Sequence, residues 1–179
     1  MIYIPYVEGL AQRGYADLIE AEIAASFQRQ YPEKFHPPRS KRSVEDFSLR
    51  DETGDHWYDV KSFDVNADFS MPNLISVDRL KKILKDPLQT LSYISVYYSV
   101  DHDKKVVDII DHLVYNVCMI DHSCLAIQNL GLGILQLKNA KDPIVTYEGD
   151  DWEKDFDAMV VEFYTKQVKK FTTLMENYQ

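Results

Sequence analysis

Residues 44–64 read VEDFSLRDETGDHWYDVKSFD, and this stretch predicts a β-hairpin around which the rest of the chain is arranged. In residues 44–50 the side chains alternate between two faces, with Asp46 on the face opposite Phe47. Residues 51–55 are dense in turn formers, and Gly54 can adopt a positive φ. A second strand over residues 56–63 places four side chains on one face: Trp57, Asp59, Lys61 and Phe63. We therefore expect two paired strands with charged groups near one edge of a sheet.

Asp46, Asp59 and Lys61 would lie close together in such a hairpin. Two carboxylates and an ammonium are costly to gather away from water unless their charges are compensated. A hard divalent cation such as Mg²⁺ takes oxygen ligands and would compensate the carboxylates. The hairpin therefore predicts a metal site. The alternative is a sheet edge held together by ordinary salt bridges.

The order of these residues resembles the motif of the PD-(D/E)XK nuclease superfamily. That motif has an acid at the end of one strand and (D/E)-x-K on the next. Here Asp46 would be the first acid and Asp59-Val60-Lys61 the second half. Glu45 stands where the family name has proline, which is the loosest part of the motif. The resemblance covers mainly residues 15–76, and within the superfamily it is greatest to type II restriction endonucleases.

The resemblance implies an α/β fold in which a central mixed β-sheet is flanked by helices, as in restriction endonucleases. It also implies Mg²⁺-dependent hydrolysis of phosphodiester bonds in double-stranded DNA at a short specific sequence. Asp46, Asp59 and the backbone carbonyl of Val60 would hold the metal. Lys61 would orient or deprotonate the attacking water and stabilise the phosphate.

Residues 15–30, YADLIEAEIAASFQRQ, predict a helix with one apolar face. In the resembling enzymes, a helix before the hairpin often supplies one more acid to the catalytic and metal site. Glu20 is the first candidate because it lies beside the apolar face, and Glu22 is the second. The alternative is that both are solvated helix charges.

The tripeptide D-x-K carries little information alone, because Asp103-Lys104-Lys105 also matches it. That second copy falls in a predicted turn between strands 91–100 and 105–110, with no acid strand paired before it. Strand context and the upstream acid therefore favour Asp59.

Length and composition indicate one globular domain over residues 1–179, with 45% hydrophobic residues. No apolar run is long enough to span a bilayer, and the N-terminus does not resemble a signal peptide. We expect a cytoplasmic protein that does not contact membranes. Cys118 and Cys124 are predicted to be buried free thiols, because their spacing matches no zinc motif.

The net charge of −9 opposes DNA binding at first sight. Eight acids and two bases fall between Glu45 and Asp68, however, and bound metal would neutralise part of that excess. Bases cluster in the proline-broken loop 34–42 and again in residues 79–85, so a basic groove is compatible with the negative total. The candidate DNA-contacting residues are Arg39, Lys41, Arg42, Asn66, Ser70, Asn73, Gln136, Lys138 and Asn139.

The remaining pattern predicts a loop over 66–76, a helix over 77–84, a helical or irregular buried segment over 112–122 and a strand over 134–138. A terminal helix over 151–178 has an apolar face that could cover the sheet or a second subunit: Phe156, Met159, Val160, Phe163 and Tyr164.

Three functions are compatible with this sequence. A site-specific endonuclease that cuts both strands needs two active sites, which implies a homodimer. A repair or recombination nuclease of the same fold would read DNA structure rather than sequence. A non-catalytic acidic binding protein would explain the net charge directly and would bind no metal at Asp46 and Asp59.

Overall fold

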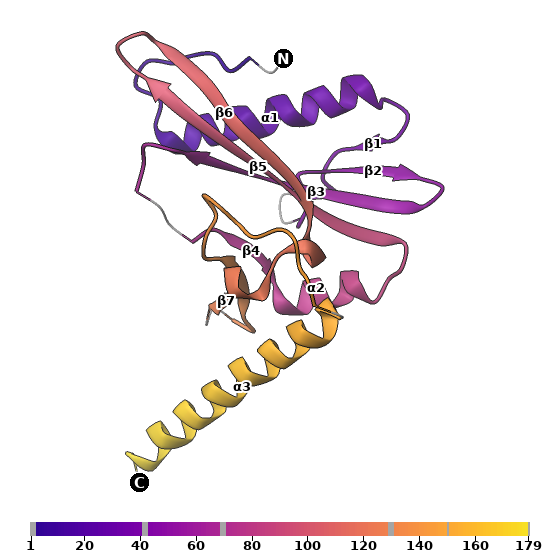
Figure 1. The fold of residues 1–179 in the computed structure, drawn as a ribbon, viewed down its shortest axis with the longest axis vertical. Helices are drawn as coiled ribbons and strands as arrows, with labels where there is room; N and C mark the ends of the chain where they lie inside the picture. The colour runs from indigo at the N-terminus through magenta and orange to yellow at the C-terminus, as the bar shows by residue number, and fades with distance from the viewer. Residues whose placement is uncertain (1–2, 41–42, 69–70, 129–130, 150, 179) are drawn as a thin grey trace.

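The computed structural model describes residues 3–40, 43–68, 71–128, 131–149 and 151–178 (Figure 1). Lys41, Arg42 and Ser70, three of the predicted DNA-contacting residues, lie outside these ranges. In chain order the elements are α1 (Gln12–Gln30), β1 (Phe35–His36), β2 (Phe47–Asp51), β3 (Gly54–Asp64), β4 (Asn73–Ser76), α2 (Val77–Leu84), β5 (Gln89–Asp101), β6 (Val106–Asn116), the 3₁₀ turns η1 (Val117–Met119) and η2 (His122–Cys124), β7 (Leu125–Gln128), β8 (Ile134–Leu137) and α3 (Trp152–Glu176).

The main sheet has five strands in the order β1-β2-β3-β5-β6. β3 and β5 are parallel, and the other neighbours are antiparallel, so the sheet is mixed. A second sheet, antiparallel in the order β4-β8-β7, lies below the first in Figure 1. The predicted α/β class with a mixed sheet flanked by helices is confirmed.

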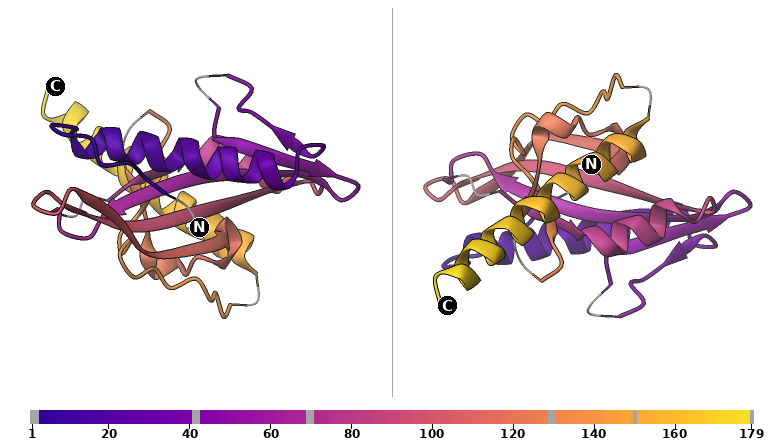
Figure 2. Two further views of the ribbon diagram at one scale, coloured as in Figure 1. Left: turned by 90° about the horizontal axis from the view of Figure 1, so that it is seen from above. Right: turned by 90° about the horizontal axis from the view of Figure 1, so that it is seen from below.

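Two apolar clusters lie on opposite faces of the main sheet. On one face α1 contributes Tyr15, Ile19 and Ile23, which pack against side chains such as Phe47 and Val60. On the other face α2, the small sheet and the first turns of α3 pack over Leu91, Tyr93 and Tyr115, among others. Figure 2 shows α1 and the C-terminal elements on opposite sides of the sheet. Because neighbouring strand residues point to opposite faces, Asp59 and Val60 face different clusters.

The predicted hairpin is confirmed, but its first strand is shorter than expected. β2 begins at Phe47 rather than Val44, while β3 continues to Asp64. Gly54 has a φ of +135° at the turn, where the backbone oxygen of Leu88 lies 2.1 Å from the place that a Cβ would occupy. Glycine is therefore required there by both conformation and space.

The predicted loops over 34–42 and 66–76 were wrong in part, because they contain β1 and β4. β7 was also missed, and residues 112–116, predicted as helical or irregular, continue β6. Short strands of this kind are stabilised by partners far along the chain, such as β8 for β4, so a local pattern does not reveal them. The helix over 77–84 and the strands over 91–100 and 134–138 were predicted to within a few residues.

Both long helices were predicted. α1 begins at Gln12, three residues earlier than expected. α3 is capped by Asp151, whose carboxylate accepts a hydrogen bond from the N–H of Lys154 at 3.0 Å. Its first turns are anchored by Trp152, whose indole N–H donates to the Ile120 carbonyl at 2.8 Å, and by buried Phe156. The rest of α3 projects away from the body of the molecule (Figure 1).

Cys118 and Cys124 are both free thiols, as predicted, although only Cys124 is fully buried. None of the helices, within the residues described, has the length and apolar character needed to cross a bilayer.

Candidate active site

The candidate site lies along one edge of β3, where β2 has ended. β2 and β3 pair from Asp51 opposite Gly54 up to Phe47 opposite Tyr58, and the N–H of Asp46 makes one further bond to the Tyr58 carbonyl at 2.8 Å. The next N–H on this edge of β3 belongs to Val60, and it donates instead to Asp46 Oδ2 at 2.6 Å. The Asp46 carboxylate therefore takes the place of a strand partner beside the Asp59-Val60-Lys61 segment.

Asp59 and Lys61 lie on the same face of β3 because they are two residues apart. Lys61 Nζ donates to Asp59 Oδ1 at 2.7 Å. Asp59 is only 4% exposed, whereas the lysine side chain reaches the surface more freely, at 23%. Tyr93, opposite Asp59 on β5, is fully buried, and its hydroxyl has no hydrogen-bond partner among the described residues.

Glu20 reaches the same edge from α1, on the other face of the sheet. It sits next to Ile19, one of the residues that dock the helix on the sheet. Its carboxyl shares a hydrogen bond with Asp46 and feels the charge of Lys61. Glu22 is directed elsewhere, because it forms an ion pair with Arg29 at 2.7 Å. Of the two predicted helix acids, the structure therefore brings Glu20 into the cluster.

Burial and mutual repulsion shift the acidity of this cluster. Burial, followed by the charge and hydrogen bond of Asp46, raises the pKa of Glu20 to about 7. The pKa of Asp59 is also raised to about 7, first by burial; Lys61 opposes that shift, while Asp46 adds to it. Three carboxyl groups thus surround one ammonium, and at neutral pH the cluster retains protons or needs a further positive charge.

Three of these residues, Asp46, Asp59 and Lys61, form one wall of a polar cleft of about 520 Å³, whereas Glu20 is not among the residues that line it. Its lining combines Asp46, Asp59 and Lys61 with residues from β4, α2 and β8, namely Asn73, Leu74, Ile75, Ser76, Arg79 and Ile134, together with Ser43 and Val44. The cleft therefore opens between the main sheet and the small sheet, with the N-terminal end of α2 on its border.

A second hollow, of about 260 Å³, adjoins this cleft through the shared residues Ser43, Val44 and Arg79. Arg39 and Lys82 also line it, and the Arg39 guanidinium lies 5.2 Å from the centre of the Trp57 ring. The indole N–H of Trp57 is buried and has no hydrogen-bond partner among the described residues. Basic and aromatic groups thus lie directly beside the acidic cluster.

The predicted DNA-contacting residues divide into two groups. Arg39 and Asn73 line the two hollows, and Gln136 is linked to them because its amide donates to Asn73 Oδ1 at 2.9 Å. Asn66 lies instead beyond the end of β3, in a separate hollow with acidic neighbours such as Asp101 and Asp108. Lys138 and Asn139 are exposed after β8 and line neither hollow.

Arg79 was not singled out from the sequence, although it borders both hollows. The amphipathic pattern of residues 77–84 could have indicated its exposed position. Val77, Leu80 and Ile83 are buried there, so Arg79 lies off the apolar face. In the sequence Arg79 is only one member of the basic cluster over residues 79–85.

Among the residues described, no group of three or more His, Cys, Asp or Glu side chains is arranged to hold a metal ion. The predicted ligand set contains three carboxylates, those of Asp46, Asp59 and Glu20, together with the carbonyl of Val60; these three do not form such a ready-made group, and metal binding stays a prediction. A scan against protein-family models finds no match to this chain, and a search of curated proteins also finds none.

Proposed function

We propose that this protein is a Mg²⁺-dependent endonuclease that hydrolyses double-stranded DNA, with the organisation of a type II restriction enzyme. The observation that carries the proposal is the meeting of Glu20, Asp46, Asp59 and Lys61 at the open edge of β3. These groups come from a helix, a pre-strand segment and a strand. Asp46 also accepts the Val60 N–H, but an asparagine could fill that role, so the sheet edge does not require acids at all of these positions. A salt-bridged sheet edge would need only one acid for Lys61.

The donor set fits a hard divalent cation. Carboxylate and carbonyl oxygens are the ligands that Mg²⁺ prefers, and Asp46, Asp59, Glu20 and the Val60 carbonyl supply such atoms. Two of these acids have pKa values raised to about 7, so a dication would relieve their repulsion. The Tyr93 hydroxyl beside Asp59, which finds no hydrogen-bond partner in the part of the chain that the structure describes, would also be served by a water of the ion's hydration shell. When bound there, Mg²⁺ would polarise the scissile phosphate and lower the pKa of a water.

Lys61 is the residue assigned to the reacting groups. Lys61 lines the cleft, and its ammonium is held by Asp59 at 2.7 Å, which fixes its position. In this position it can stabilise negative charge on the phosphate and orient the attacking water, or accept its proton when neutral. A charged group in such a position speeds the reaction without supporting the fold. Loss of the ammonium should therefore lower the turnover rate more than it lowers stability.

The adjoining basic hollow offers a path for the DNA backbone despite the net charge of −9. Arg39, Arg79 and Lys82 border it, next to the acidic cluster. Cations that neutralise phosphates supply much of the affinity for DNA, and local potential matters more than total charge. The Trp57 ring and the N-terminal end of α2 add a stacking surface and a site favourable to anions.

The direct test is incubation of the purified protein with methylation-free plasmid and genomic DNA in Mg²⁺. We expect discrete fragments from the wild type, and none in EDTA or from Asp59→Asn. The matched control is Asp103→Asn, which alters the other D-x-K tripeptide at an exposed turn and should cut like the wild type.

The pattern of products separates the candidate functions. Fixed ends on plain duplex identify the site-specific enzyme, whereas cleavage confined to branched or flapped DNA identifies the structure-specific nuclease. Absence of cleavage on all substrates, with no effect of Mg²⁺ on thermal stability, would overturn the proposal. The non-catalytic acidic binding protein would then be the better explanation of the charge.

A further inference from the structure

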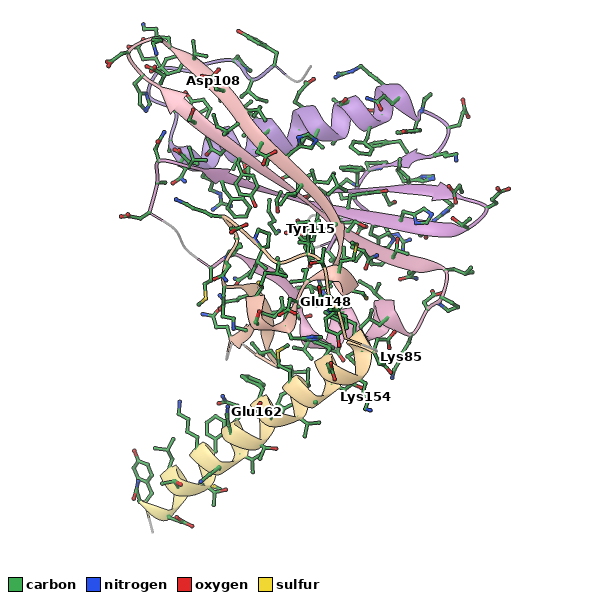
Figure 3. The ribbon with its side chains drawn as sticks, in the orientation of Figure 1. Lys85, Asp108, Tyr115, Glu148, Lys154 and Glu162 are labelled. Carbon is green, nitrogen blue, oxygen red and sulfur yellow. The ribbon has the colours of Figure 1, made fainter. Side chains whose placement is uncertain are left out.

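The C-terminal half of α3 is an unpartnered helix with an apolar stripe. Beyond Phe156 the helix still contacts the body through Met159, Val160 and the Tyr164 hydroxyl, which donates to the Leu132 carbonyl, and its remaining turns extend alone (Figure 1). Glu162, labelled in Figure 3, lies where the helix leaves the body. Seven large hydrophobic side chains on it are exposed by 37 to 90%, and six of them form one stripe, bordered by Leu174: Val161, Tyr164, Val168, Phe171, Met175 and Tyr178. Soluble monomers seldom leave so many large apolar groups contiguous and uncovered.

These six residues follow a heptad repeat. They are separated alternately by three and four residues from 161 to 178, which corresponds to consecutive a and d positions. Such a stripe is narrower than the face that docks a helix on a globular core, and it is the seam of a helix-to-helix contact. The docking residues Phe156 and Met159 lie on a different side of the helix, whereas Val160 borders the stripe and Tyr164 within it donates a hydrogen bond to the Leu132 carbonyl.

Charge is excluded from both borders of this seam. The e and g positions within 161–178 are Thr165, Gln167, Thr172 and Leu174. All charged residues of this segment lie on the opposite side: Glu162, Lys166, Lys169, Lys170 and Glu176. Charges at e and g positions form interhelical salt bridges that set partner choice and orientation. A seam without them meets no like-charge repulsion when it faces its own copy.

We propose that the projecting half of α3 pairs antiparallel with the same segment of a second copy of this chain. In this alignment Val161 faces Tyr178 of the second copy, Tyr164 faces Met175, and Val168 faces Phe171. Each layer then combines an aromatic side chain with a smaller one, which keeps the volume even along the seam. Parallel pairing would instead stack each residue on its own copy, which gives small valine–valine layers, large aromatic–aromatic layers and one methionine–methionine layer.

The segment is long enough for a specific contact. Eighteen residues span about 27 Å at the helical rise. Six aromatic and six aliphatic seam side chains from two copies can bury on the order of 1,000 Å², the area that a specific interface needs. This pairing does not depend on the proposed nuclease activity, and its test uses no DNA.

Sedimentation equilibrium of the full chain tests the proposal. We expect the wild type at about 50 µM to have twice the monomer mass of 20.9 kDa. Val168→Asp and Phe171→Asp place a charge in the seam and should weaken dimerisation at least about a hundredfold. Thr173→Asp, the matched control, places the same charge on the far side of the helix and should remain dimeric. A monomeric wild type, or dimers unaffected by both seam variants, would overturn the proposal.

Disulfide trapping tests the orientation. In a Cys118→Ser background, a mixture of Val168→Cys and Phe171→Cys chains should cross-link under mild oxidation, because these positions face one another across the antiparallel pair. Either variant alone should cross-link far less. Efficient cross-linking of Val168→Cys with itself would show the parallel arrangement instead and overturn the antiparallel pairing. Circular dichroism of each variant checks that α3 remains helical.

Discussion

The carboxylate of Asp46 accepts a hydrogen bond from the backbone N–H of Val60 at 2.6 Å, at the point where β2 stops pairing with β3. A single side chain thus closes the edge of the sheet and also stands between Glu20 and Asp59. The same bond fixes the Val60 peptide, whose carbonyl is one of the proposed metal ligands. Asp46 therefore both stabilises the sheet edge and positions the groups of the proposed metal site.

Substitution of Asp46 should separate these two roles. Asp46→Asn keeps an oxygen acceptor for the Val60 N–H, so we expect near-wild-type stability but loss of Mg²⁺-dependent cleavage. Asp46→Ala also leaves that N–H unpaired and should lower the free energy of unfolding by about 1–3 kcal/mol. Urea denaturation and plasmid cleavage measure the two effects. Equal stability of the two variants would show that the hydrogen bond from the Val60 N–H to residue 46 does not stabilise the fold.

Asp59 should make stability fall as pH rises. Its pKa is raised to about 7 in the folded state from 3.8, so the folded state binds its proton more tightly. The contribution of Asp59 to the free energy of unfolding is therefore highest below about pH 4. It declines between about pH 4 and pH 7, by on the order of 4 kcal/mol in all. Asp59→Asn should flatten this decline and be more stable than the wild type at pH 8. Asp103→Asn, at an exposed turn, should leave the pH profile unchanged.

Mg²⁺ should oppose that decline in the wild type. At pH 8 a concentration of 100 times Kd would stabilise the folded state by about 2.7 kcal/mol. The effect should shrink at pH 5.5, where the raised pKa values of Glu20 and Asp59 leave protons competing for the same oxygens. Differential scanning fluorimetry with Mg²⁺ or EDTA measures the shift in Tm. A shift of the same size in Asp46→Asn would place the ion elsewhere.

Lys61→Ala should reduce the cleavage rate by about 10²–10⁴-fold while DNA binding changes little. The ammonium is proposed to act on the reacting phosphate and water, and it also lowers the pKa of Asp59. Its loss should therefore move the pH dependence of stability to higher pH. Single-turnover rates and DNA-binding titrations distinguish turnover from affinity. Lys104→Ala, an exposed lysine paired with Asp101 at 2.9 Å, is the control.

Gly54→Ala should be strongly destabilising, because the added Cβ would meet the Leu88 backbone oxygen at 2.1 Å. Gly131→Ala is the matched control. Gly131 also has a positive φ, of +57°, but no atom lies within 4 Å of the added carbon. The control should cost only about 1 kcal/mol, the conformational penalty alone. Urea denaturation compares the two, and equal losses would show that the Leu88 contact has no effect.

The amino-acid sequence alone determined the elements that depend on local pattern. The helices over 15–30, 77–84 and 151–178 and the strands flanking Gly54 were predictable, because periodicity, caps and turn formers act over a few residues. Asp59 and Lys61 had to share a face for the same reason, since they are two residues apart on one strand. Asp46 followed from the hairpin, although its role as a substitute strand partner did not.

Only the tertiary structure decided which distant groups meet this pair. The choice of Glu20 over Glu22 depends on how α1 crosses the sheet, and the place of Arg79 depends on where the β4–α2 segment returns to it. The small sheet, with β4 between the hairpin and α2, arises from pairing with β8 about sixty residues later. Such contacts are set by the packing of whole faces against one another, a property that no window of neighbouring residues contains.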